Sequence, residues 1–173
     1  MSLPKPVLER EKALKSLSTR EKILLCFQCG TCVGGCPIAR AISRYSPRKI
    51  LEKILLGDAK NILTSDLVWL CAYCHTCYER CPQRVGLSNV FMDLKNLAAD
   101  MGNVPEELAK EALQMIRTGW IVPSSPVIDR RRVEMKLPSI PRVNVAEIQE
   151  IAKATGFLKL IPEAKKRGGS RGV

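Results

Sequence analysis

Eight cysteines, gathered in two short runs, are the residues of this sequence whose type and spacing can do chemistry. The first run reads CFQCGTCVGGCP and the second reads CAYCHTCYERCP. Both follow the spacing C-x2-C-x2-C-x3-C-P, and an offset of 45 residues superposes one run on the other. The cysteines are Cys26, Cys29, Cys32 and Cys36 in the first run, and Cys71, Cys74, Cys77 and Cys81 in the second.

This spacing is typical of the cysteine ligands of [4Fe–4S] clusters, each of which takes four thiolates. Three cysteines three residues apart can wrap a turn around one cluster. In two-cluster ferredoxins the fourth cysteine, which precedes a proline, ligates the neighbouring cluster. The repeat therefore predicts two [4Fe–4S] clusters with exchanged ligands. We expect cluster 1 to be held by Cys26, Cys29, Cys32 and Cys81, and cluster 2 by Cys71, Cys74, Cys77 and Cys36.

Other uses of clustered cysteines fit the sequence less well. Structural zinc usually takes two paired ligands, a long spacer and a second pair, disulfide scaffolds belong to oxidising compartments, and a thioredoxin-type pair needs a βαβ setting. The only histidine, His75, lies inside the second run. We expect it to be a turn residue, because four cysteines are already available for each cluster. A zinc-stabilised module that binds nucleic acid is the alternative that metal analysis would test.

Helical segments must position the two runs. Ser46 and Pro47 form a typical helix start, with Gly57 at the exit, and the apolar residues between them fall on one face. Ser88 and Asn144 are candidate N-caps of later helices. No alternating strand pattern appears, so an all-α fold is predicted. The expected helical segments, with their caps, are residues 8–25, 46–57, 64–70, 88–102, 105–119 and 144–156.

Residues 120–143 differ from the rest of the chain. They contain four prolines and show little periodicity. Apolar residues such as Ile121 and Val122 are unusual for a linker that contacts only solvent. We expect an extended, proline-rich arm that docks on a partner. Three regions follow from this: a cluster-binding domain with an N-terminal helix (1–119), the arm (120–143), and a C-terminal helix with a basic tail (144–173).

The composition limits the function classes. No apolar run approaches the roughly 18 residues that a membrane helix needs, and the N-terminus lacks the apolar stretch of a secretory signal. We therefore expect a cytoplasmic protein without direct membrane insertion. The formal charge is +11, but a [4Fe–4S] cluster with four thiolates carries a charge of about −2, so part of the basic excess offsets cluster charge. No nucleic-acid-binding motif accompanies the charge, and no nucleic-acid partner is expected.

The helix between the two runs resembles the α-helical ferredoxin fold of the succinate dehydrogenase and fumarate reductase iron–sulfur subunits. A more specific resemblance covers residues 20–125. The stretches CFQCGTCVGGCP, PRKILEKILLG, SDLVWLCAYCHTCYERCPQRV, LKNLAADMG and TGWIVP resemble the C subunit of methanogen-type heterodisulfide reductase.

The resemblance implies an electron-transfer role in an oxidoreductase complex. In that family the C subunit holds two [4Fe–4S] clusters and passes electrons from the flavin-containing A subunit to the B subunit. The B subunit reduces the heterodisulfide of coenzyme M and coenzyme B, and a hydrogenase or formate dehydrogenase joins the larger assembly. This chain has no G-x-G-x-x-G fingerprint and no cysteine outside the two runs, so a non-catalytic relay is expected. The alternatives are the equivalent subunit of a heterodisulfide-reductase-like sulfur-metabolism complex and a free dicluster ferredoxin.

Overall fold

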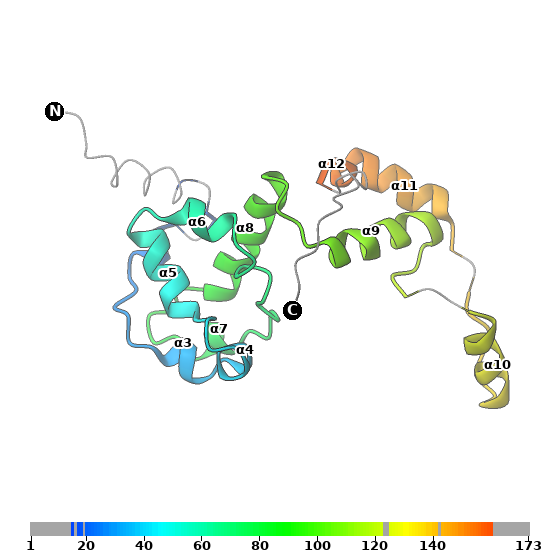
Figure 1. Ribbon diagram of the computed structural model, residues 1–173, viewed down its shortest axis with the longest axis horizontal. Helices are drawn as coiled ribbons and strands as arrows, with labels where there is room; N and C mark the ends of the chain where they lie inside the picture. The colour runs from blue at the N-terminus through cyan, green and yellow to red at the C-terminus, as the bar shows by residue number, and fades with distance from the viewer. Residues whose placement is uncertain (1–14, 16, 19, 123–124, 142, 161–173) are drawn as a thin grey trace. The chain divides into compact units, whose positions relative to one another are not determined.

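The computed structural model describes residues 15, 17–18, 20–122, 125–141 and 143–160 (Figure 1). Within these residues helices are the only regular secondary structure, as the sequence predicts. None of the described helices is long and apolar enough to cross a bilayer. The chain divides into two compact units, one ending at Asn103 and the other beginning at Val104. The sequence pattern predicts this boundary after residue 119, whereas the structure groups residues 104–119 with the second unit.

The first unit contains short helices around the cysteine runs and two longer ones that carry the core. Its helices are α2 (Arg20–Ile23), α3 (Thr31–Gly34), α4 (Pro37–Ala41), α5 (Pro47–Leu55), α6 (Ala59–Leu63), α7 (Thr76–Glu79) and α8 (Leu87–Asp100). The second unit contains α9 (Glu106–Thr118), α10 (Pro126–Glu134), α11 (Val145–Ala154) and α12 (Phe157–Leu160).

Helix α5 begins where the sequence predicts. The Ser46 hydroxyl accepts a hydrogen bond from the backbone N–H of Lys49 at 3.4 Å, and Pro47 occupies the first helical position. Both features favour a helix start, because the cap satisfies a free N–H and proline has none to satisfy. The buried face of α5 carries Ile50, Leu51 and Ile54.

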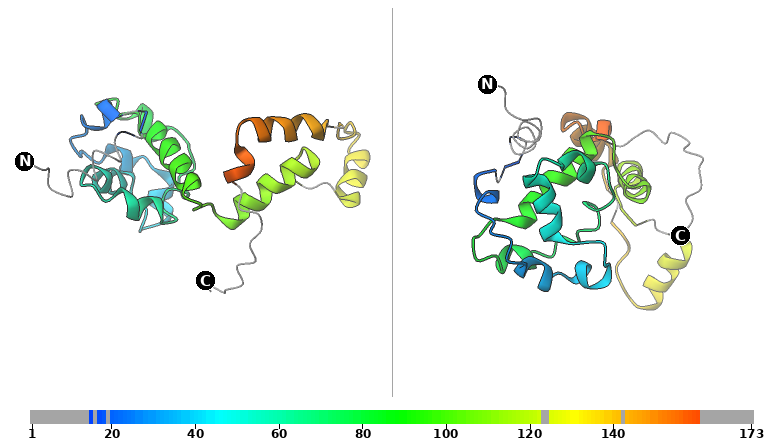
Figure 2. Two further views of the ribbon diagram at one scale, coloured as in Figure 1. Left: turned by 90° about the horizontal axis from the view of Figure 1, so that it is seen from above. Right: turned by 60° about the vertical axis from the view of Figure 1, so that its left-hand side comes forward.

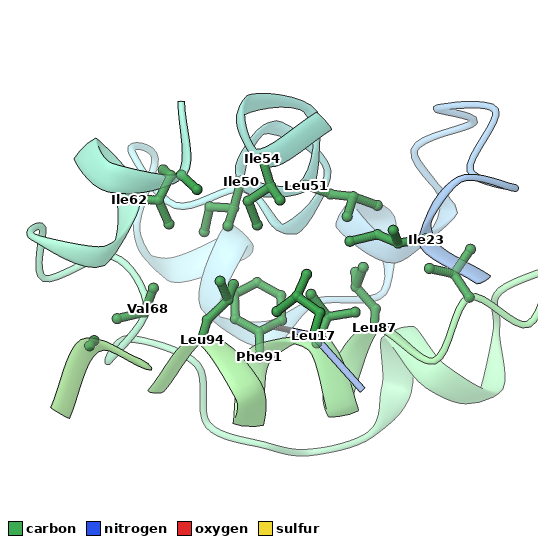
Figure 3. Close-up of a cluster of buried hydrophobic side chains, with 14 of the residues drawn as sticks. Leu17, Ile23, Ile50, Leu51, Ile54, Ile62, Val68, Leu87, Phe91 and Leu94 are labelled. Atoms are coloured by element: carbon green, nitrogen blue, oxygen red, sulfur yellow. The ribbon is translucent and has the colours of Figure 1, made fainter. Parts of the chain in front are cut away.

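The core of the first unit lies between α5 and α8. Figure 3 shows Ile50 and Ile54 of α5 pointing toward Phe91 and Leu94 of α8, and all four side chains are buried. Burial of each such side chain contributes about 1.5–3 kcal/mol to the free energy of unfolding. Cys36 belongs to this buried cluster, and five further cysteines pack against it. The core and the cysteine runs are therefore one packing unit.

The N-cap of helix α8 lies two residues earlier than the sequence predicts. Gly86, with φ of 74°, is the N-cap residue, and Ser88 lies inside the first turn with 1% of its surface exposed. The left-handed conformation at the cap favours glycine. The Ser88 side chain is thereby released from capping the helix.

The helix expected over residues 64–70 is absent. These residues form turns, and the helix lies just before them as α6. The Ser65 hydroxyl donates a hydrogen bond to the carbonyl of Ile62 at 2.7 Å and accepts one from the N–H of Leu67 at 3.3 Å. These side-chain hydrogen bonds replace the helical backbone pattern.

The described residues between 8 and 25 do not form one continuous helix, although the sequence predicts one. Residues 8–14, 16 and 19 lie outside them, and α2 covers only Arg20–Ile23, with Leu17 and Ser18 not helical. The backbone N–H and the hydroxyl of Ser18 both donate to Oδ2 of Asp93, at 2.8 and 2.7 Å. A contact between residues so distant in sequence cannot be anticipated from local helix propensity.

In the second unit, α9 and α11 lie side by side and antiparallel (Figures 1 and 2). Ile116 and Ala152 are the buried residues at their contact, and Gln149 donates a hydrogen bond to the carbonyl of Ile116 at 3.3 Å. The side chain of Asn144 caps α11 by accepting from the N–H of Ala146 at 3.2 Å.

The segment expected to be an extended arm contains a helix. Ser125 caps α10 by accepting from the N–H of Ile128 at 3.4 Å, and Pro126 is its first residue. The proline that argued against regular structure therefore starts a helix, because proline is tolerated at that position. No residue of α10 is buried. The predicted basic tail falls within residues 161–173, outside the described residues.

Gly119, which ends α9, is a position where a side chain is excluded. Its φ is 78°, and an added Cβ would lie 2.6 Å from Cγ1 of Val143. We expect Gly119→Ala to lower the free energy of unfolding of the second unit by about 2–4 kcal/mol, from backbone strain and overpacking together. Hydrogen exchange of the amides of α9 and α11 measures the effect.

Gly156→Ala is the matched control, because Gly156 has φ of 75° but an added Cβ would meet nothing within 4 Å. We expect this variant to lower the free energy of unfolding only through backbone strain, by about 1–2 kcal/mol. Equal losses in the two variants would mean that the contact with Val143 does not constrain the unit.

Candidate iron–sulfur centres

The two cysteine runs repeat in backbone conformation as well as in sequence. Gln28 and Tyr73, which are related by the 45-residue offset, both have positive φ, at 63° and 52°. Gly30 and His75 are related in the same way, with φ of 81° and 60°. Each pair of left-handed residues turns the chain between successive cysteines and leads into α3 in the first run and α7 in the second.

His75 occupies the left-handed position that glycine occupies in the first run. It is the N-cap residue of α7, and its ring meets that of Tyr73 edge-on at a centroid distance of 4.4 Å. Histidine is among the residues enriched in this conformation. Its position in a turn agrees with the expectation from sequence.

Four cysteines line each of two cavities. The first, which we name the motif-one cavity, has a volume of about 340 Å³, and the second, the motif-two cavity, about 350 Å³, both including space open to solvent. The motif-one cavity is lined by Cys26, Cys29, Cys32 and Cys81, and the motif-two cavity by Cys71, Cys74, Cys77 and Cys36. The closing cysteine of each run thus lies in the wall of the other run's cavity.

The two runs approach each other closely at Gly35. Helix α3 packs against α7, and an added Cβ at Gly35 would lie 3.0 Å from Cγ2 of Thr76. A glycine at this position lets one run reach the cavity of the other.

The N-termini of α5 and α8 lie between the two cavities. Pro47 and Ser88 line the motif-two cavity, while the residues next to them in sequence, Arg48 and Leu87, line the motif-one cavity. The N-terminus of a helix carries a partial positive charge, which stabilises anions. The same two helices therefore stabilise negative charge in both cavities.

Backbone and side-chain N–H groups also point at the sulfurs. The N–H of Ala39 donates to Sγ of Cys36, and that of Val85 donates to Sγ of Cys81, each at 3.4 Å. In the motif-one cavity Nε2 of Gln28 lies 3.6 Å from Sγ of Cys26. Such hydrogen bonds stabilise thiolate ligands and tune the clusters that they hold.

In each cavity one thiol has a raised pKa and another has a lowered pKa, and the two positions correspond between the runs. Burial and neighbouring thiolates raise the pKa of Cys32 to about 11 and that of Cys77 to about 12. The Thr31 hydroxyl, 3.3 Å from Sγ of Cys29, lowers the pKa of Cys29. The Thr76 hydroxyl, 3.5 Å from Sγ of Cys74, lowers the pKa of Cys74.

Tyr45 and Ser88 are site residues that the sequence pattern does not reveal. Tyr45 is 2% exposed and lines the motif-two cavity, and burial together with the negative charge of the neighbouring Cys71 thiolate raises the pKa of its hydroxyl. The Ser88 hydroxyl is buried without a hydrogen-bond partner among the described residues. The only signal in the sequence is that Tyr45 directly precedes Ser46, the predicted cap of the helix that follows the first cysteine run.

The donor set fits iron–sulfur clusters. All eight cysteines are free thiols, and no Asp or Glu is among the described residues that line either cavity. Among the described residues no three His, Cys, Asp or Glu side chains gather closely enough to hold a single metal ion. Four thiolates around an open cavity are the ligands that a [4Fe–4S] cluster takes.

Comparisons with known proteins agree with this donor set. Residues 22–85 match the family described as a 4Fe–4S dicluster domain. The chain is 36% identical to the second iron–sulfur C subunit of CoB–CoM heterodisulfide reductase of Methanocaldococcus jannaschii, over 90% of this chain and 86% of that protein. It is 35% identical to the iron–sulfur C subunit of the same enzyme of Methanopyrus kandleri, over 92% and 82%. It is 33% identical to the C2 subunit of H2/formate:CoB–CoM heterodisulfide,ferredoxin reductase of Methanococcus maripaludis, over 87% and 81%. Two [4Fe–4S] clusters are thus the cofactors that the domain and the eight cysteines support.

The acidity pattern predicts the order of alkylation in the cluster-free chain. Iodoacetamide at pH 8 should modify Cys29 and Cys74 first, because they are exposed and their pKa values are lowered. Cys32 and Cys77 should react last and gain reactivity only as the pH approaches their raised pKa values of about 11 and 12. Peptide mass spectrometry at a series of pH values measures each rate.

Thr31→Val should raise the pKa of Cys29 and slow its alkylation at pH 8 several-fold, because the valine cannot donate to the thiolate. The rate at Cys74 should not change in this variant, and Thr76→Val should have the reciprocal effect. Unchanged rates in both variants would show that the threonine hydroxyls do not set the acidity of these thiols.

Proposed function

The chain belongs to the family of iron–sulfur C subunits of CoB–CoM heterodisulfide reductase, and we propose on this basis that it is the electron relay of such a complex. In this proposal it passes electrons from the flavin-containing A subunit to the B subunit, which reduces the heterodisulfide of coenzyme M and coenzyme B in methanogenesis. The observation that carries the proposal is the pair of cavities, each lined by four cysteines, on either side of the α5 and α8 N-termini.

The cysteines would hold the two clusters by exchange between the runs. Cluster 1 would be held by Cys26, Cys29, Cys32 and Cys81, and cluster 2 by Cys71, Cys74, Cys77 and Cys36; the cavity linings support both sets. When bound, each cluster takes up and releases one electron at a time. The apolar core between α5 and α8 holds the two cavities in a fixed arrangement.

The chain itself is proposed to be non-catalytic. All of its cysteines line the two cavities, which leaves no thiol to attack a disulfide. The chain therefore supplies electrons, and the disulfide is reduced on another subunit. A cytoplasmic location accords with eight thiols that must stay reduced to bind clusters.

The assembly proposed here includes an electron-supplying enzyme. One relative carries H2 and formate in its name together with ferredoxin. A hydrogenase or a formate dehydrogenase would accordingly deliver electrons to the A subunit of this complex. No nucleic-acid partner is proposed.

Anaerobic co-purification of the tagged full-length chain tests the relay. We expect A and B subunits to co-elute, and the complex to oxidise reduced cluster on addition of the coenzyme M–coenzyme B heterodisulfide. Co-elution with a different disulfide reductase would assign the chain to a related sulfur-metabolism complex. Elution as a monomer that transfers electrons to any acceptor would instead make it a free ferredoxin.

Two reciprocal variants test the exchanged ligation. In Cys36→Ala, alkylation of the anaerobically loaded chain should reach Cys71, Cys74 and Cys77 while the set lining the motif-one cavity stays protected. In Cys81→Ala it should reach Cys26, Cys29 and Cys32 instead. Iron should fall from about eight to about four atoms per chain in each variant.

Circular dichroism serves as the control that each variant keeps its helices. If Cys36→Ala exposed the other cysteines of its own run, each run would be holding a cluster by itself, and the exchange would be wrong.

A further inference from the structure

Two buried side-chain polar atoms of the described residues have no hydrogen-bond partner, Oε1 of Gln28 and the hydroxyl of Ser88. Ser88 is 1% exposed, lies in the first turn of α8, lines the motif-two cavity, and has no hydrogen-bond partner among the described residues. A buried hydroxyl without a partner costs about 1–3 kcal/mol, and native proteins keep few of them. A group that fills the cavity would provide the missing partner.

Tyr45 brings a second hydroxyl to the same cavity. Its ring is 2% exposed and packs against Phe91 of α8, with ring centroids 6.1 Å apart. The ring is thereby fixed, and Tyr45 and Cys71 line the same cavity. A tyrosine hydroxyl is protonated at neutral pH and can donate.

The motif-one cavity has neither hydroxyl. Its cysteines and Thr31 correspond to the cysteines and Thr76 of the motif-two cavity, and the other lining residues with polar side chains are Gln28 and Arg48. Tyr45 and Ser88 lie outside the repeated runs, so they distinguish one cavity from the other although the cysteine sets are equivalent.

We propose that Tyr45 and Ser88 are positioning residues that donate hydrogen bonds to sulfurs in the motif-two cavity and raise the reduction potential of the cluster held there. The proposal rests on the proposed binding of cluster 2 by Cys71, Cys74, Cys77 and Cys36. Uptake of one electron makes the cluster and its thiolates more negative by one charge. A donor at a sulfur stabilises that more negative state, which raises the potential.

Redox titration followed by EPR, on the anaerobically loaded full chain, measures the two midpoint potentials. We expect Ser88→Ala and Tyr45→Phe each to shift one midpoint to a more negative value and to leave the other unchanged, and the double variant to shift it further. The matched control is Tyr78→Phe, because Tyr78 is exposed, lies on α7 and lines neither cavity.

The single-cluster variants assign the shift to a cavity. Combined with Cys81→Ala, which leaves only the motif-two cluster, Ser88→Ala should still shift the midpoint. Combined with Cys36→Ala, which leaves only the motif-one cluster, it should not. Pulsed ENDOR in D2O adds a structural readout, because each variant should lose one exchangeable deuteron that couples to the reduced cluster.

The outcomes separate this inference from the proposed function. Two clusters per chain with both midpoints unchanged in Ser88→Ala and Tyr45→Phe would overturn the role of the hydroxyls and leave the relay standing. A shift confined to the motif-one cluster would overturn it as well. Failure of the proposed ligation would show first in the alkylation pattern of the parent Cys36→Ala and Cys81→Ala variants.

Discussion

The cost of placing negatively charged thiolates in a partly buried space, close to one another, is the constraint on which the first unit depends. Four sulfurs share each cavity, and the raised pKa values of Cys32 and Cys77 show what it costs to bring negative charge there without a cation. The fold places partial positive charges near these sulfurs. The N-termini of α5 and α8 lie between the cavities, and backbone N–H groups point at Cys36 and Cys81. Clusters with ferric and ferrous iron supply the remaining positive charge when they bind.

The exchange of closing cysteines has a mechanical consequence. Cys36 lies in the cavity of the second run and belongs to the buried core, while Cys81 lies in the cavity of the first run. Binding of either cluster would therefore tie both runs together and stabilise the whole unit, since ligand binding to the folded state adds to its stability. The cost is that neither run is a complete site alone. Gly35 is part of this arrangement, because a side chain there would press on Thr76.

A grouping of the cysteines could be proposed from the sequence because ligand spacing within a run is a local property. The start of α5 was predictable for the same reason, since Ser46 and Pro47 act within one turn. The failures have longer-range causes. Ser18 leaves the helical pattern to bond with Asp93, and Ser88 is drawn into a cavity wall while Gly86 takes the cap. A sequence pattern records which residues can cap or continue a helix, but not which tertiary partner competes for them.

A duplicated run builds two similar cages, and the surroundings of each cage set the potential of the cluster that it would hold. In this chain the repeated residues, which are the cysteines, the paired threonines and the left-handed turns, make the cavities alike. Within the runs, Gln28 faces one cavity where Tyr73 faces the other, and further differences come from outside the runs: Tyr45 before α5, Arg48 within it, and Ser88 on α8. The same two helices that offset the charge of both cavities thus carry two of the side chains that distinguish them, Arg48 and Ser88. Differences in potential can then change through single substitutions on α5 and α8 without disturbing the ligand spacing that both clusters need.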